Sequence, residues 1–129
     1  MSKIISILLF LSLFSTTIEA STHRDIYLVD QTFCKARAML GKASADARKR
    51  GTLKEKWEYQ LDMMRKDPKS SEFLYVGSHM ALMDLNTIYS ADINRDTKLL
   101  YLDLFNDCMV FYGRTIKLPT GSQIYSYLK

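Results

Sequence analysis

Apolar residues between Ile26 and Ala47 recur at gaps of three and four, and this spacing constrains the fold more than any other feature of the sequence. Such gaps place side chains on one face of an α-helix. We therefore expect one long amphipathic helix that begins between Thr22 and Asp25 and runs to Ala47. Its first half carries bulky side chains and its second half alanines, so a neighbouring helix should approach the second half more closely. The stripe consists of Ile26, Val29, Phe33, Ala36, Leu40, Ala43 and Ala47.

The first twenty residues have the layout of a secretory signal peptide. Lys3 supplies a positive charge, an apolar run extends from Ile4 to Phe14, and Ala20 stands just before a polar stretch. This order is typical of a segment that is cleaved during export. An uncleaved membrane anchor is the alternative, but a span needs roughly 20 apolar residues. We predict that residues 1–20 are a signal peptide, and that the mature protein is periplasmic or secreted with no stable membrane insertion.

The sequence contains two cysteines, Cys34 and Cys108. In an exported chain this number predicts one disulfide, because disulfides form and persist in oxidising compartments. A redox-active thiol pair is the alternative, but the Cys-X-X-Cys spacing typical of such pairs is absent. We therefore expect a structural disulfide that closes a loop over most of the chain, a closure worth about 4 to 5 kcal/mol on the chain-entropy model.

Two further helices are expected in the middle of the chain. The first opens at Thr52, where Glu55 completes a capping box, and ends before Pro68. The second begins at Ser70 or Ser71 and is apolar on nearly every side, so it should be the most buried helix.

A fourth helix is expected from about Asn94 to Tyr112, where the spacing turns Cys108 inward and Gly113 ends the helix. The four helices predict an all-α fold, a small four-helix bundle stapled by the Cys34–Cys108 disulfide, with residues 21–113 as the helical domain. Residues 114–129 form a C-terminal tail without a helical stripe, which either docks on the bundle as a final helical turn or extends as an arm.

Six residues are candidates for binding a partner. Trp57, the only tryptophan, is either a packing anchor or an anchor for a partner, and packing is favoured. The basic run at residues 48–50 is either a solvated helix end or a surface for phosphate or membranes, and the solvated end is favoured. The aromatic tail either packs on its own domain or binds another protein. The six candidates are Arg48, Lys49, Arg50, Trp57, Tyr125 and Tyr127.

The sequence contains no recognisable catalytic or metal-binding motif, so we predict that the protein is not an enzyme and needs no cofactor or metal. His79 is interpreted as a packing residue, and the carboxylates Glu55, Glu58 and Asp62 as a solvated helix face. The net charge of +4 is too small to indicate nucleic acid, although it suits an acidic partner or an anionic surface.

The mature chain resembles a loose set of short exported bacterial proteins of unknown function, which have one early cysteine, an Ala-Arg-x-x-Gly helix end and a late Phe-x-x-Cys. It carries Phe33-Cys34, Ala47-Arg48 with Gly51, and Phe105 with Cys108 at those places. In size, export and fold class it is also similar to periplasmic immunity proteins of type VI secretion. We expect a non-enzymatic exported binding protein, possible forms being an immunity protein or an inhibitor of a secreted toxin or enzyme. An envelope accessory or structural protein without a tight partner is the alternative.

Overall fold

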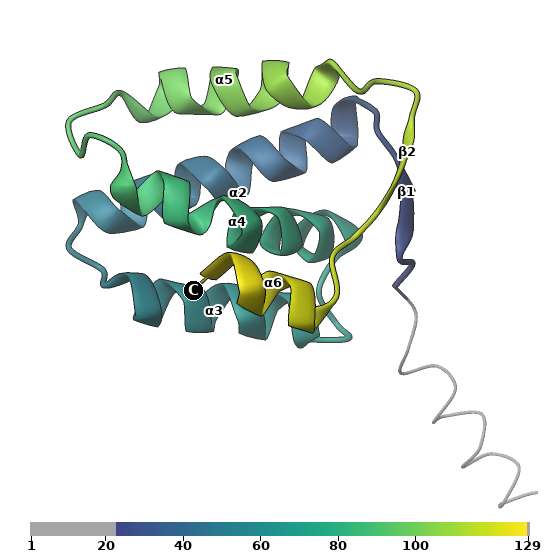
Figure 1. Cartoon of the computed structure of the whole chain (residues 1–129), viewed down its shortest axis with the longest axis horizontal. Helices are drawn as coiled ribbons and strands as arrows, with labels where there is room; N and C mark the ends of the chain where they lie inside the picture. The colour runs from purple at the N-terminus through teal and green to yellow at the C-terminus, as the bar shows by residue number, and fades with distance from the viewer. Residues whose placement is uncertain (1–22, 129) are drawn as a thin grey trace, which may run out of the picture.

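The computed structural model describes residues 23–128, so the predicted signal peptide and Thr22 lie outside the described residues. Helix α2 lies between α5 and α4, while α3 and α6 pack against α4 (Figure 1). The predicted all-α bundle with its disulfide is confirmed, with an additional helix and a two-stranded sheet. The elements are β1 (Ile26–Leu28), α2 (Gln31–Lys49), α3 (Lys54–Lys66), α4 (Glu72–Ser90), α5 (Thr97–Met109), β2 (Thr115–Lys117) and α6 (Gly121–Leu128).

The first helix begins later than its apolar spacing predicts. The N-cap of α2 is Asp30, whose side chain accepts a 2.8 Å hydrogen bond from the amide of Phe33. Residues 26–28 form β1 instead and pair antiparallel with β2, with Tyr27 opposite Ile116. The prediction of a start between Thr22 and Asp25 is therefore wrong. Helical spacing could not exclude a three-residue strand whose partner lies far along the chain.

The predicted disulfide joins Cys34 of α2 to Cys108 of α5, with their Cα atoms 5.5 Å apart. Both residues are buried, and Cys108 is the only fully buried residue of α5. Since α5 packs mainly against α2, the disulfide lies in the contact that holds α5 on the bundle.

Close approach between α2 and α4 depends on Gly77. A Cβ atom at this position would lie 2.9 Å from the carbonyl oxygen of Ala36 and 2.7 Å from the Leu40 side chain. The sequence predicts close approach in the alanine-rich second half of α2, and this contact lies near the middle of the predicted span, at Ala36 and Leu40. The small residue that permits it belongs to α4, so the spacing within α2 could not reveal it.

The predicted capping box of the second helix does not form. Leu53 is the N-cap of α3 and makes no side-chain capping bond, while the Thr52 carbonyl accepts a 2.9 Å hydrogen bond from the Tyr89 hydroxyl. Gly51 has a φ of +86°, as expected for a residue that follows a helix end.

The predictions for the last two large helices were closer. Helix α4 begins after Ser71, which caps it, and it contains more buried residues than the other helices of residues 23–128. Helix α5 begins only after its N-cap Asp96 and ends at Met109, so it is shorter than the predicted span. Tyr112, expected at the end of this helix, lies in the following turn and is exposed.

The tail folds back on the domain. After β2 it forms α6, whose Ile124 is 3% exposed and packs in a core cluster with Trp57, Leu61 and Leu82. Of the two outcomes left open by the sequence, the docked tail is the one found. No helix in the described part of the chain is both long and apolar enough to cross a membrane.

Candidate functional site

A groove with a volume of about 230 Å³ runs between α3 and α6. Leu82 and Ile124, both buried, lie at its base. Tyr59 and Tyr125 line it, and their side chains are 66% and 59% exposed. Pockets for small molecules usually measure about 300 to 1,000 Å³, so this groove suits a side chain of a partner better than a cofactor.

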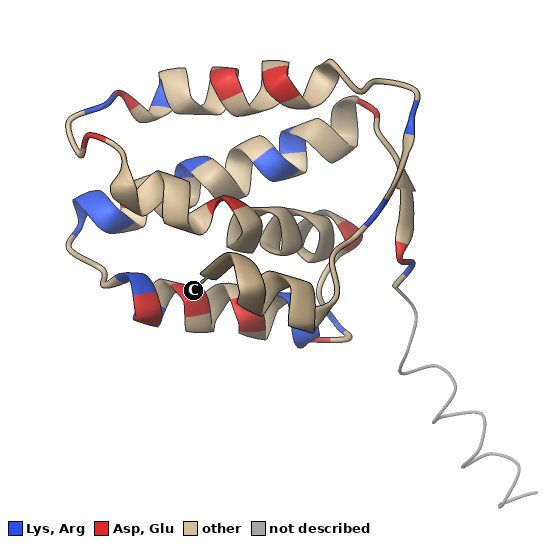
Figure 2. Cartoon of the chain, viewed as in Figure 1, with Lys and Arg blue, Asp and Glu red and all other residues tan. Residues whose placement is uncertain are grey.

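Acidic side chains line the α3 wall of the groove. Glu55, Glu58, Tyr59 and Asp62 are spaced by three, one and three residues, which places them on one face of the helix. Figure 2 shows acidic residues repeated along α3, while α6 carries no charged residue. Over residues 23–128, neither Glu55 nor Glu58 has a cation within ion-pair distance. The wall therefore presents two carboxylates without an ion-pair partner in this range, beside Arg65, which also lines the groove and pairs with Asp62.

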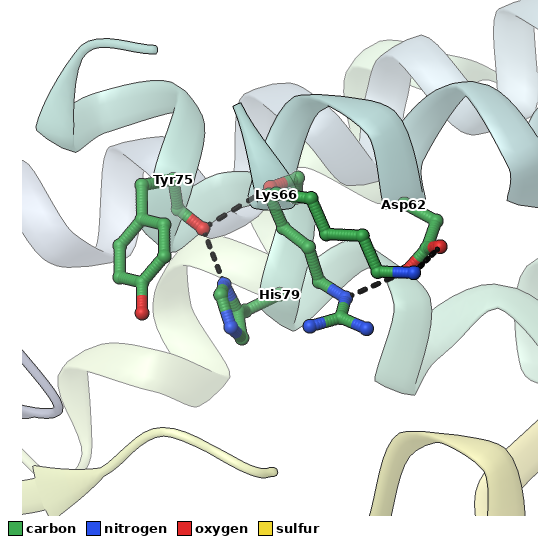
Figure 3. Close-up of polar contacts among 6 residues, drawn as sticks. Asp62, Lys66, Tyr75 and His79 are labelled. Carbon is green, nitrogen blue, oxygen red and sulfur yellow. Dashed lines mark hydrogen bonds and ion pairs between the residues drawn. The ribbon is translucent and has the colours of Figure 1, made fainter. Parts of the chain in front are cut away.

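Asp62 differs from these two glutamates because its charge is already neutralised. It contacts Arg65 Nε and Lys66 Nζ, each at 2.8 Å, as Figure 3 shows for Lys66. Burial on its own would raise the pKa of Asp62, but the hydrogen bonds and charges of Lys66 and Arg65 outweigh it and lower that pKa. The triad of one carboxylate and two cations has a net charge of +1, so the acidic character of the groove comes from Glu55 and Glu58 alone.

Carboxylates beside exposed tyrosine rings have the chemistry to contact a cationic side chain. The carboxylates supply charge-assisted hydrogen bonds, and the rings supply cation–π contacts. A lysine or arginine of another protein has this chemistry.

A second groove, of about 330 Å³, is lined by β1, α2 and α4, and its charged lining residues Arg24, Asp30 and Glu72 give it a net charge of −1. Arg24 pairs with Glu72 at 2.8 Å across it. Tyr27 also lines it, with a hydroxyl that is buried without a hydrogen-bond partner of normal geometry among the described residues. Burial, with a contribution from the charge of Glu72, raises the pKa of Tyr27 to about 12. The net charge of this groove belongs to Asp30, whose carboxylate caps α2 by accepting a hydrogen bond from the Phe33 amide, so it is less available to a partner than the two glutamates of the first groove are.

Trp57 lies in the core, where it is 9% exposed and its indole N–H donates a 2.8 Å hydrogen bond to Ser44 Oγ. Ser44 Oγ in turn donates to the Leu40 carbonyl at 2.7 Å. This is the packing role that the sequence favoured, and it leaves little of the ring for a partner.

The three basic residues at the end of α2 have different surroundings. Arg48 donates hydrogen bonds to the carbonyl oxygens of Ile88 and Ala91 at the C-terminal end of α4. It therefore stabilises a second helix end, which the interpretation as a solvated terminus did not include. Lys49 and Arg50 are exposed.

The aromatic residues of the tail are both exposed, and only one of them lines the acidic groove. Tyr125 lines it, whereas Tyr127 does not, although the Tyr127 carbonyl accepts a hydrogen bond from Asn86. The structure brings Tyr125 together with Glu55 and Glu58, which the sequence had interpreted as a solvated face.

His79 is 4% exposed, and its Nδ1 lies 2.7 Å from the carbonyl oxygen of Tyr75 (Figure 3). Burial lowers the pKa of His79, although the contact with Tyr75 opposes the change. Its ring also packs edge-on against the Tyr75 ring, so its surroundings are those of a packing residue. Within residues 23–128, no three His, Cys, Asp or Glu side chains are grouped closely enough to hold a metal ion.

No protein-family model, curated protein or solved structure matches this chain.

Proposed function

We propose that this protein is an exported, non-enzymatic binding protein that takes a basic segment of another protein into the groove between α3 and α6. An immunity protein or an inhibitor, which occludes a secreted toxin or enzyme, is the form we propose. The observation that carries the proposal is the position of two carboxylates, those of Glu55 and Glu58, beside the exposed rings of Tyr59 and Tyr125.

The scaffold around the groove supports this role. One wall is α3, the other is α6, and both are held on α4 by a core cluster that includes Ile124. A prearranged surface binds with a smaller loss of conformational entropy than a surface that orders on binding. The disulfide agrees with a periplasmic or secreted location, because disulfides persist in oxidising compartments.

The first test uses defined probes. The exported protein is titrated with two peptides of equal length, one with lysine and arginine residues and one with glutamate in their places, and NMR shifts are recorded. We expect the basic peptide to shift resonances of α3 and α6 in a saturable, salt-sensitive way. The double variant Glu55→Gln/Glu58→Gln should lose about twofold to thirtyfold in affinity, since two exposed charge pairs are removed.

Asp103→Asn/Asp107→Asn on α5 is the control, because it removes two exposed negative charges from a helix that does not line the groove; Asp103 differs from the glutamates in being paired with Arg95. The same three proteins then serve as bait in extracts that contain secreted toxins and enzymes. One stoichiometric partner should be retained by the wild type and by the α5 control and lost by the groove variant. Equal retention by the groove variant would refute the assigned site, and the absence of any partner would refute the binding function.

A further inference from the structure

One edge of the molecule carries five large apolar side chains that are half or more exposed, with two cations beside them. The exposed fractions range from 50% for Phe111 to 77% for Val110. We call these seven residues the edge patch: Ile26, Leu28, Val110, Phe111, Tyr112, Arg114 and Lys117. Their surface is separate from the acidic groove, which none of them lines.

Strand pairing places the first part of the edge patch on one face. Side chains alternate along a strand, and Tyr27 of β1 is buried, so its neighbours Ile26 and Leu28 face outward. Lys117 is paired with Ile26, and directly opposite residues of an antiparallel pair lie on the same face. Figure 1 shows β1 and β2 running together along one side of the molecule.

The turn after α5 continues this surface. The Gly113 amide donates to the Val29 carbonyl at 2.9 Å, and the Val29 amide donates to the Arg114 carbonyl at 2.8 Å. These bonds extend the pairing of the two strands by one step, so the turn that carries residues 110–112 lies at the end of the sheet. Gly113 adopts a φ of +84°, which allows the chain to reverse there.

The two segments that carry the edge patch, residues 23–29 and 110–117, have a net positive charge. Arg114 and Lys117 take part in no ion pair within residues 23–128, and the Arg114 guanidinium carbon lies 5.9 Å from the centroid of the Phe111 ring. Asp25 is the only acidic residue in segments 23–29 and 110–117. Arg24 in the same region is engaged by Glu72.

We propose that the edge patch docks on an anionic membrane surface. The apolar side chains, with the two rings among them, enter the boundary between headgroups and acyl chains, and Arg114 and Lys117 contact lipid phosphates. Aromatic rings favour this boundary, and long cationic side chains extend from it to the phosphates. Charge complementarity favours this occupant over a second copy, because a two-fold contact would bring the cations of two patches together.

This docking is interfacial and is compatible with a protein that does not insert into the membrane. It is also independent of the proposed function. An exported binding protein held in this way would keep its acidic groove available to a partner, because the groove and the edge patch share no residue.

The test measures vesicle co-sedimentation of protein recovered after export of the full chain, with intact mass confirming removal of the leader. One set of vesicles is pure phosphatidylcholine, and the other contains one part phosphatidylglycerol to three parts phosphatidylcholine. We expect binding to the anionic vesicles that weakens with salt. The double variant Arg114→Gln/Lys117→Gln should weaken binding to the anionic vesicles by about thirtyfold, because each cation near an anionic surface contributes roughly fivefold in affinity. Val110→Ser/Tyr112→Ser should weaken binding about tenfold or more.

Each double variant has a matched control. Tyr125→Ser/Tyr127→Ser removes two exposed rings from α6, and Lys49→Gln/Arg50→Gln removes two exposed cations from the end of α2. Both should bind the vesicles like the wild type, and circular dichroism confirms that every variant is folded. Failure of the wild type to bind, or equal losses in the patch variants and their controls, would overturn the proposal. The proposal would also be overturned if the protein formed a dimer through the edge patch and did not bind vesicles, since a second copy of the chain would then cover the patch.

Discussion

Replacing Cys34, Cys108 or both by alanine tests how far the disulfide stabilises the fold. The two cysteines are separated by 74 residues, and on the chain-entropy model closing a loop of this length contributes about 4.5 kcal/mol at 25 °C. Each alanine also removes a buried sulfur, at a cost on the order of 1 kcal/mol. Domains are typically stable by roughly 5 to 15 kcal/mol, so the variants should be far less stable than the wild type.

The expected pattern is strongly non-additive. Either single variant should lose nearly the whole amount, and the double variant should lose at most about 1 kcal/mol more, because the crosslink can be removed only once. Treatment of the wild type with a reductant should give a similar loss.

Urea denaturation with two probes measures these losses. Circular dichroism reports all helices, while fluorescence of Trp57 reports the core cluster that does not contain the disulfide. If α5 leaves the bundle before the rest unfolds, the dichroism curve should begin to change before the fluorescence curve. Additive losses, or single variants as stable as the wild type, would refute the assigned role of the crosslink.

Four further variants test the interior. Gly77→Ala should destabilise by about 1 to 3 kcal/mol despite a better helix propensity, because the new methyl group meets a backbone carbonyl. Gly41→Ala should change stability much less in the same denaturation assay, since only the flexible Leu104 side chain must move. Ser44→Ala should cost about 1 to 3 kcal/mol by leaving the Trp57 indole N–H without its partner, and a red-shifted fluorescence would accompany water entry. Burial lowers the pKa of His79 from its ordinary value of 6.5, so the unfolded chain takes up the proton first as the pH falls. Stability should therefore decline below about pH 6.5, and His79→Gln should flatten that part of the pH profile; an unchanged slope would exclude this histidine as the cause.

Several features that depend on neighbouring residues could be predicted from the sequence, although the capping box at Thr52 was predicted wrongly. Ser71 caps α4 and Gly51 follows the end of α2, because capping chemistry is local. The disulfide was predictable because the sequence offers only one pair of cysteines. The heavy burial of α4 followed from apolar residues on nearly every side.

Features that depend on distant segments could not be predicted in this way. The strands have three residues each, too few to show an alternating pattern, and their partners lie far apart in the sequence. Arg48 looked like a solvated helix end because the carbonyls it contacts belong to α4.

One wall of the candidate groove could be predicted from the sequence, and the other could not. The spacing of Glu55, Glu58, Tyr59 and Asp62 already defined one acidic face of a helix. That face becomes one wall of a groove only because α6 packs beside it, and nothing in the sequence indicated that Tyr125 would line this groove.

The pairing of β1 with β2 has a consequence for the order of folding. Ile26 pairs with Lys117, so the first strand acquires its partner only when the chain through β2 is present. Contacts between segments so distant form late and slow a folding reaction, whereas α2, α3 and α4 can associate earlier through shorter loops. Chains that stop before α5 should therefore persist as partly folded, aggregation-prone intermediates, and closure of the strand pair should be the slow step that separates them from the native protein.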